Sequence, residues 1–233
     1  MLRLLVLVEG QTEEEFVKEV LRPHLQSFGY LNVSARILGN ARLREKRGGI
    51  RGWDTVRTEI LRHLSEDAGC IVTTMVDYYA LPQLGSNGWP GRHPSGPMDF
   101  LMKASAVEDA LLKNISAGSR SESVGYRFVP FVVMHEFEGL LFSDCNAFAR
   151  GVGRMDLASK FQSIRDEFST PEEINDSPET APSKRVASLM PGYQKPFLGN
   201  LAALEIGLVK MRTACSHFAE WVSKLENIGK PFI

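Results

Sequence analysis

The chain has 233 residues, which is enough for one sizeable domain with an elaboration. Hydrophobic residues make up 43% and charged residues 24%, and the formal net charge is −1, so overall charge points neither to nucleic acid nor to a membrane surface. Three widely spaced cysteines, no signal-peptide pattern and no apolar run of about 18 residues predict a cytoplasmic protein without a membrane span.

Strand and helix patterns alternate through the first half of the chain. Leu4 to Val8 form an apolar run typical of a strand buried on both faces. A helix is predicted to follow, capped by Thr12 and kinked or restarted at Pro23. The further predicted elements are strands over 32–38, 70–77 and 127–134 and helices over 53–67 and 98–115. This alternation predicts an open, mainly parallel α/β sheet flanked by helices.

The character of the sequence changes after about Ala149. Helical patterns dominate the remainder, and between them lies a connector rich in Pro, Ser and charge. We therefore assign residues 1–149 to the α/β domain. Residues 150–233 are predicted to be a helical extension packed on that same domain.

Acidic residues stand where three of the predicted strands end. Glu9 follows the first strand, Asp77 ends the third, and the last strand leads into His135, Glu136 and Glu138. The carboxyl ends of parallel strands meet at one edge of a sheet, so these carboxylates should lie together and repel one another without a cation. Mg²⁺ or Mn²⁺ suits such hard oxygen ligands, and Glu9, Asp77 and Glu138 are the predicted metal ligands. Glu136 would be a further catalytic ligand or base.

Each of these residues also has a plain structural interpretation. Glu9 alone could cap the following helix or pair with an arginine, and Asp77 could cap a turn. His135 is a candidate to contact substrate, although a single histidine at a strand end is more often structural. Gly10 allows close approach of the backbone to a ligand, and Thr12 with the first helix amides could contact an anion.

Two basic segments could bind phosphate. Lys184 and Arg185 lie in the connector, and a Gly-rich basic loop spans 42–51. The alternative for the connector is a well-capped helix start with Ser183 as the cap, and for the loop a solvated surface. The chain contains no GxxxxGK[ST] or GxGxxG motif and no zinc-ligand spacing.

Two of these segments resemble motifs of a known superfamily. "VEGQTE" after the first strand and "VDYY" after the third are similar to the Toprim superfamily of type IA and II topoisomerases, bacterial primases and OLD-family nucleases. There, a Glu ends the first strand, a DxD motif ends a later one, and both bind Mg²⁺ at a nucleic-acid phosphate. The resemblance implies that Glu9 and Asp77 fill the first two of these positions and that Glu13 lines the site. "HEFE" would supply the further acids of OLD-type nucleases.

Over nearly its full length the chain resembles the Toprim-like family called domain of unknown function 4276. The shared segments are "VEGQTEEEFV", "TTMVDYYALP", "HEFEGLLFSD" and "INDSPETAPSKR". The family name carries no activity, so this resemblance implies the fold and the place of the site only.

The sequence departs from the superfamily pattern at Tyr79, which stands where DxD has its second Asp. A phenol of ordinary pKa, ~10, is a poor Mg²⁺ ligand, although it can stack on a base or contact a phosphate. Two hypotheses follow: a Mg²⁺-dependent phosphodiesterase or nuclease, or a non-catalytic partner module of an ATPase in a prokaryotic defence or DNA-maintenance system. A third is an enzyme that acts on a small nucleotide.

Overall fold

The protein was analysed as a computed structural model that describes residues 1–38, 50–83, 85–92, 98–118, 123–174 and 179–230. Five parallel strands form its sheet: β1 (Arg3–Val8), β2 (Asn32–Ile37), β3 (Cys70–Asp77), β4 (Phe128–Val129) and β5 (Val132–Val133). The order is β2-β1-β3-β4, and β5 also pairs with β3. The predicted parallel α/β sheet flanked by helices is thereby confirmed.

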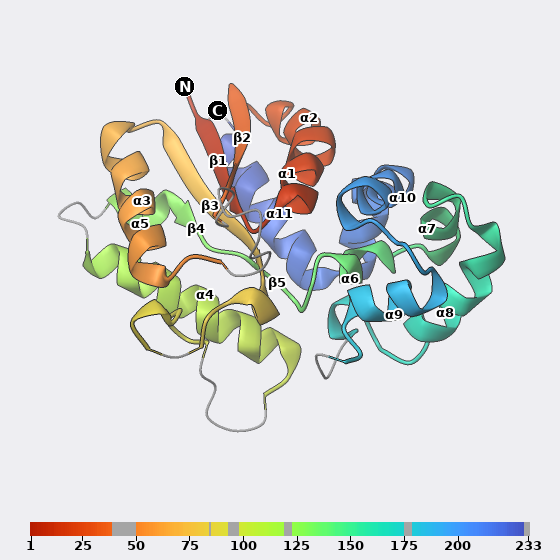
Figure 1. The fold of residues 1–233 in the computed structure, drawn as a ribbon. Helices are drawn as coiled ribbons and strands as arrows, with labels where there is room; N and C mark the ends of the chain where they lie inside the picture. The colour runs from red at the N-terminus through yellow and green to blue at the C-terminus, as the bar shows by residue number, and fades with distance from the viewer. Residues whose placement is uncertain (39–49, 84, 93–97, 119–122, 175–178, 231–233) are drawn as a thin grey trace.

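Helices cover both faces of this sheet and also form a group to one side of it (Figure 1). In the N-terminal half they are α1 (Gln11–Phe16), the π-helical turn η1 (Val17–Leu21), α2 (Arg22–Gln26), α3 (Trp53–Glu66), η2 (Tyr78–Ala80), η3 (Gly85–Asn87), α4 (Phe100–Ala117) and α5 (Ser123–Tyr126). In the C-terminal half they are α6 (Glu138–Leu141), α7 (Cys145–Gly151), η4 (Met155–Leu157), α8 (Ala158–Arg165), η5 (Pro171–Glu173), α9 (Pro182–Leu189), η6 (Lys195–Gly199), α10 (Asn200–Ala214) and α11 (Ser216–Gly229).

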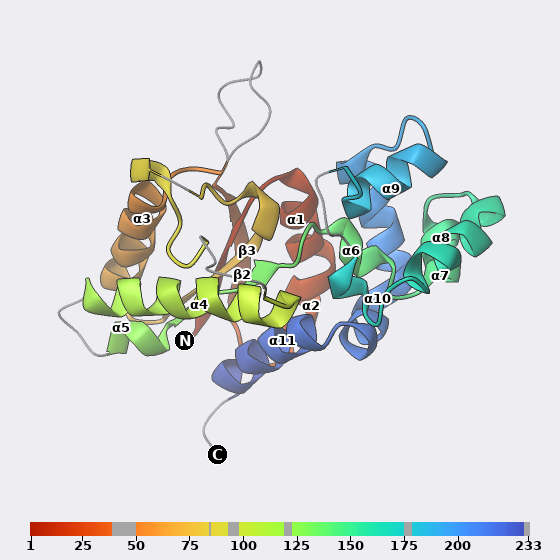
Figure 2. The ribbon, with the colours of Figure 1, turned by 90° about the horizontal axis from the view of Figure 1, so that it is seen from below.

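Two apolar clusters, one on each face, hold the layers together. One cluster packs α3 and α4 against Leu7, Val72 and Val76 of the sheet. The other packs α1, η1, α2 and α11 against Leu4 and Val6, and it continues without a break into α7, α8 and α10. The helices α7 to α10 lie together on one side of the molecule in both views (Figures 1 and 2). The division after residue 149 falls inside α7.

Several predicted elements differ in detail from the structure. The predicted helix from Thr12 begins at Gln11 with Gly10 as its cap, and it changes to a π-helical turn just before Pro23. The single strand predicted over 127–134 is split into β4 and β5. Pro130 between them has no N–H to donate to a sheet. The hydroxyl of Thr74 bridges the gap instead, since it donates to the Phe131 carbonyl and accepts from the Phe131 N–H, both at 2.9 Å.

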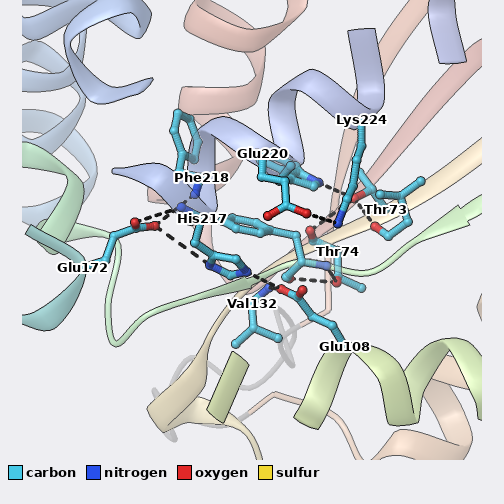
Figure 3. A network of polar contacts seen from close by, with 12 residues as sticks. Thr73, Thr74, Glu108, Val132, Glu172, His217, Phe218, Glu220 and Lys224 are labelled. Carbon is cyan, nitrogen blue, oxygen red and sulfur yellow. Dashed lines mark hydrogen bonds and ion pairs between the residues drawn. The ribbon is translucent and has the colours of Figure 1, made fainter. Parts of the chain in front are cut away.

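A buried imidazole ties the last helix to the sheet (Figure 3). Nε2 of His217 hydrogen-bonds Glu108 Oε1 at 2.9 Å, and that same oxygen accepts the Val132 N–H of β5 at 2.9 Å. Glu172 accepts the backbone N–H groups of His217 and Phe218 at the start of α11. The network joins α4, β5, η5 and α11, so it fixes the helical layer next to the strand ends.

His217 should make the stability of the protein depend on pH. Burial alone would lower the pKa of His217, but the hydrogen bond that its ring donates to Glu108 and the charges of Glu108 and Glu172 raise it above 6.5. The stabilisation is therefore complete below about pH 6.5 and is lost as pH rises through the folded pKa. We expect His217→Gln to cost about 2 kcal/mol at pH 6 and clearly less at pH 9, measured by urea unfolding. An equal loss at both pH values would show that the ring matters for packing alone.

Within the residues that the structure describes, no helix has the length and apolar character needed to cross a bilayer.

Candidate functional site at the carboxyl edge of the sheet

The carboxyl ends of β1 and β3 lie at the switch point of the sheet, where the connections from these two strands leave in opposite directions. From β1 the chain runs through α1 and α2 to β2 on one side, whereas β3 lies on the other side of β1. Register pairs Val8 with Met75, so Glu9 and Asp77 emerge side by side from neighbouring strands. Ligands of open α/β sheets bind in the crevice at such a switch point. Topology therefore places both predicted acids where a ligand site is expected.

Glu13 joins this edge from the first turn of α1. Its Oε2 accepts the Gly10 N–H at 3.0 Å, which closes the start of the helix. Both Glu13 and Thr12 are buried, and the Thr12 carbonyl accepts a hydrogen bond from Asn200 of α10 at 3.1 Å. The Gly10 amide is thus bound by Glu13, and the close approach of a ligand to the Gly10 backbone stays a prediction.

The segment after β5 brings two more acids to the same place. Oδ1 of Asp77 accepts the Phe137 N–H at 3.0 Å, which fixes the turn between β5 and α6 against the end of β3. Glu138 then opens α6, and its side chain is fully buried. Glu136 is half-buried, and its Oε2 accepts the Ser183 N–H at 2.9 Å. The strand does not need to continue for Glu138 to reach the site, because α6 carries it there.

A lysine that the sequence analysis did not identify lies among these acids. Lys195 Nζ donates to Glu138 Oε2 at 3.0 Å and lies 4.0 Å from Glu136 Oε1. The residue begins η6, in a connector whose sequence has no motif that marks it out. The sequence predicts Lys184 and Arg185 for this basic role instead.

The five carboxylates of Glu9, Glu13, Asp77, Glu136 and Glu138, here called the acid cluster, influence one another electrostatically. Burial is the main cause that raises the pKa of Glu13 and of Glu138 to about 7, although Lys195 pulls both down. Burial and then the charges of Glu9 and Glu13 raise the pKa of Asp77 well above its usual value. The pKa of Glu9 is also raised, again chiefly by burial. Five carboxyl groups thus face one ammonium group, and their raised pKa values show that full ionisation of the acid cluster is unfavourable without a further cation.

Two aromatic rings lie beside the acid cluster. Tyr79 follows Asp77 by two residues in η2, and its ring stacks on His135 with centroids 5.2 Å apart and planes at 22°. His135 in turn precedes Glu136. The structure thus brings together two of the predicted substrate contacts, Tyr79 and His135, as a stacked pair that links the ends of β3 and β5.

The two predicted basic segments lie elsewhere or outside the described residues. Lys184 is exposed on α9. Arg185 donates to Glu167 Oε2 at 2.9 Å and to the Thr180 carbonyl at 3.0 Å. Neither contacts the acid cluster through any interaction recorded for the described residues. Residues 42–49 of the predicted basic loop lie outside the described residues.

Helix α9 also begins differently from the prediction. The helix starts at Pro182 and not after a Ser183 cap. The side chain of Glu136 accepts the Ser183 N–H in its first turn.

The chemistry of the acid cluster fits a hard divalent cation only in part. Among the described residues, no group of three or more Asp, Glu, His or Cys side chains is arranged to hold a metal ion, so the predicted trio of Glu9, Asp77 and Glu138 is not assembled as a ready-made site. Two buried oxygens, Glu9 Oε2 and Glu138 Oε1, have no hydrogen-bond partner. Mg²⁺ is commonly held by one or two carboxylates together with water and ligand phosphate. The residues therefore fit a cation whose coordination the ligand completes.

A cavity of about 450 Å³ lies apart from the acid cluster. Its wall includes Phe142, Asp144, Arg165 and Asp166 and none of the predicted site residues. We therefore locate the candidate site by charge and topology rather than by cavity size.

Comparisons with known proteins agree with the family resemblance. No curated protein and no solved structure matched the chain. One family model matched residues 8–226, which include the acid cluster, Lys195, Tyr79 and His135. The chain thus belongs to the family described as "Domain of unknown function (DUF4276)".

Proposed function

We propose that this chain is a divalent-metal-dependent phosphodiesterase or nuclease of the Toprim type that acts on nucleic acid. The observation that carries the proposal is the acid cluster at the switch point of the sheet, with pKa values raised by burial and mutual repulsion. Acids so perturbed at a sheet edge are typical of functional sites, because a structural role alone does not require them to be buried together. A bound cation would favour the ionised form of these acids and lower their pKa values, so the acid cluster favours a cation as part of the ligand.

The residues divide into three roles. Glu9 and Glu138, through their unpartnered oxygens, and Asp77 would hold Mg²⁺ or Mn²⁺, which when bound activates water and stabilises charge on phosphate. The acids at 138 and 77 raise the pKa of Lys195, which keeps its ammonium charged beside an anionic ligand even though burial opposes this. Glu136 Oε1 does not accept the Ser183 amide, so it can take a proton from an attacking water.

A second candidate function has its own supporting observation. Lys195 already forms an ion pair with Glu138 at 3.0 Å, so the protein supplies one cation to its own acid cluster. Together with Tyr79 in place of an acid, this favours a Toprim-like module that binds without catalysis, for example beside an ATPase partner. The two candidates differ in whether metal binding leads to cleavage.

The test compares Glu9→Gln with a matched control on the following helix. Wild type, Glu9→Gln and Glu15→Gln are incubated with circular, linear and single-stranded DNA and with RNA, in Mg²⁺, in Mn²⁺ and in EDTA. Glu15 of α1 is a half-buried acid that pairs with Lys18. Its replacement should therefore leave cleavage unchanged. We expect metal-dependent cleavage that falls by about 100-fold or more in Glu9→Gln, because a ligand oxygen is lost.

Isothermal titration of the same three proteins with Mn²⁺ separates the two candidate functions. Binding that needs Glu9 but leads to no cleavage of any substrate would favour the non-catalytic module. Cleavage that survives in EDTA would contradict a metal-dependent mechanism.

A further inference from the structure

A buried arginine lies just beyond the end of β3, outside the roles assigned so far. Arg92 is only 4% exposed. Its Nε donates to the Tyr78 carbonyl at 2.8 Å, and its Cζ lies 3.8 Å from the centroid of the Tyr78 ring. Tyr78 is the residue that follows Asp77. The guanidinium is thus held against the segment that leaves β3 for the candidate site.

The backbone fixes this position tightly. Gly91 adopts φ of +75°, and a Cβ at that residue would lie 2.1 Å from the Ala106 carbonyl oxygen of α4. Only glycine allows so close an approach in this conformation. The main chain therefore packs closely against α4 immediately before Arg92, which fixes the position of the Arg92 backbone.

Arg92 is a buried cation without an acidic partner. Among the described residues, no carboxylate lies within ion-pair distance of Arg92, and the guanidinium instead contacts the carbonyl, the ring and the side-chain hydroxyl of Tyr78. Burial lowers the pKa of Arg92, yet a guanidinium remains protonated at neutral pH. Burying a charge without a counter-ion costs free energy. A buried arginine without an acidic partner therefore suggests that a ligand supplies the anion.

The unused part of the guanidinium is the part that recognises anions. Nε donates to the Tyr78 carbonyl, and the Tyr78 side chain forms a hydrogen bond with the guanidinium, which together leave other N–H groups of the guanidinium without an acceptor among the described residues. Two N–H groups of one planar guanidinium match two oxygens of a phosphate.

The surroundings connect Arg92 to the acid cluster. The Tyr78 ring under the guanidinium meets both Tyr79 and His135 edge to face, with centroids 6.0 and 6.5 Å away. Tyr78 directly follows Asp77 after β3, and His135 directly precedes Glu136 after β5. These aromatic rings therefore connect Arg92 to two residues of the acid cluster. A ligand with more than one anionic group could contact Lys195 at one end and Arg92 at the other.

We propose that Arg92 is an anion-binding residue that holds a phosphate group of the ligand through Nη1 and Nη2. The identity of the anion as a phosphate ester rests on the proposed function, whereas the need for an anion comes from the buried, unpaired guanidinium itself. The phosphate bound there is one that does not react, so Arg92 positions the ligand rather than taking part in the cleavage.

The experiment measures anion binding in EDTA, where no metal-dependent reaction takes place. Inorganic phosphate and a fluorescent single-stranded oligonucleotide are titrated into wild type, Arg92→Gln and Arg150→Gln. The control Arg150 has a carboxylate partner, since it donates to Glu205 at 2.8 Å. We expect about tenfold weaker oligonucleotide binding in Arg92→Gln alone. The slope of log affinity against log salt should fall by about 0.7 for the one lost phosphate contact.

A measurement on the wild type guards against a variant that does not fold. In side-chain ¹⁵N NMR, the Nε–H signal of Arg92 should shift on titration with phosphate, while that of Arg150 should not. The proposal is overturned if that signal stays fixed, or if folded Arg92→Gln binds both probes as wild type does. Absence of cleavage with Arg92-dependent binding intact would remove the proposed enzyme and leave the anion site standing.

Discussion

Asp77→Asn is expected to abolish cleavage and, in the same protein, to raise the stability of the metal-free fold at pH 8. Burial and the charges of Glu9 and Glu13 raise the pKa of Asp77 far above its usual value, so at pH 8 its ionised form is unfavourable in the folded state. Asn is neutral, and its amide oxygen can still accept the Phe137 N–H that Asp77 binds at 3.0 Å. We expect a gain of about 1–2 kcal/mol in urea unfolding, with a loss of activity of about 100-fold or more.

A gain in stability paired with a loss of activity is what distinguishes a functional acid from a structural one. Asp109→Asn provides the matched control, because Asp109 is exposed on the middle of α4, and its replacement should alter neither property. If Asp77→Asn instead lowers stability by several kcal/mol while Asp109→Asn does not, Asp77 serves mainly to anchor the β5–α6 turn. The candidate site would then lose its central acid.

The sequence was sufficient to predict the sheet and the place where its acids meet. Leu4–Val8 of β1 is wholly apolar, and β3 is rich in apolar and β-branched residues. Such runs, each followed by a helical pattern, are typical of the buried strands of a parallel sheet. Once those two strands are adjacent and parallel, Glu9 and Asp77 must leave the same edge. Their proximity therefore follows from pattern alone, without any contact being known.

The charge that balances those acids could not be predicted in the same way. Lys195 begins a π-helical segment that follows an irregular stretch and leads into α10, and it reaches Glu138 through the packing of η6 on α1. Arg92 also lies in irregular chain, pinned by the contact of Gly91 with α4. Periodicity identifies regular elements and their faces. Periodicity does not indicate which loop residue folds back onto a site. The sequence therefore predicts Lys184 and Arg185, which lie in a more basic segment, and misses Lys195 and Arg92.

Glu13 should make the metal-free protein less stable as pH rises, which is the opposite of an ordinary ion-paired acid. Burial raises the pKa of Glu13 in the folded state from 4.5 to about 7. Below about pH 4.5 the carboxyl is protonated in both states, and between pH 4.5 and 7 only the unfolded chain ionises freely. Folding stability therefore falls across this window, by up to about 3 kcal/mol for this one residue. We expect Glu13→Gln to remove that fall, measured by urea unfolding at pH 5 and pH 8 in EDTA.

Glu19→Gln is the control for this prediction, because Glu19 is exposed on the same helical segment and pairs with Lys18 at 3.3 Å. Its unfolding free energy should follow wild type at both pH values. Glutamine at 13 keeps an oxygen for the Gly10 N–H, so any difference reports ionisation and not the helix start. The prediction is contradicted if the unfolding free energies of wild type and Glu13→Gln depend on pH in the same way. Glu13 would then be ionised in the folded state, with Lys195 as the cation that compensates its charge. A steeper fall in wild type that Mg²⁺ reverses would instead show that the cost of holding these acids together is recovered when a cation binds, which is the energetic signature of a binding site.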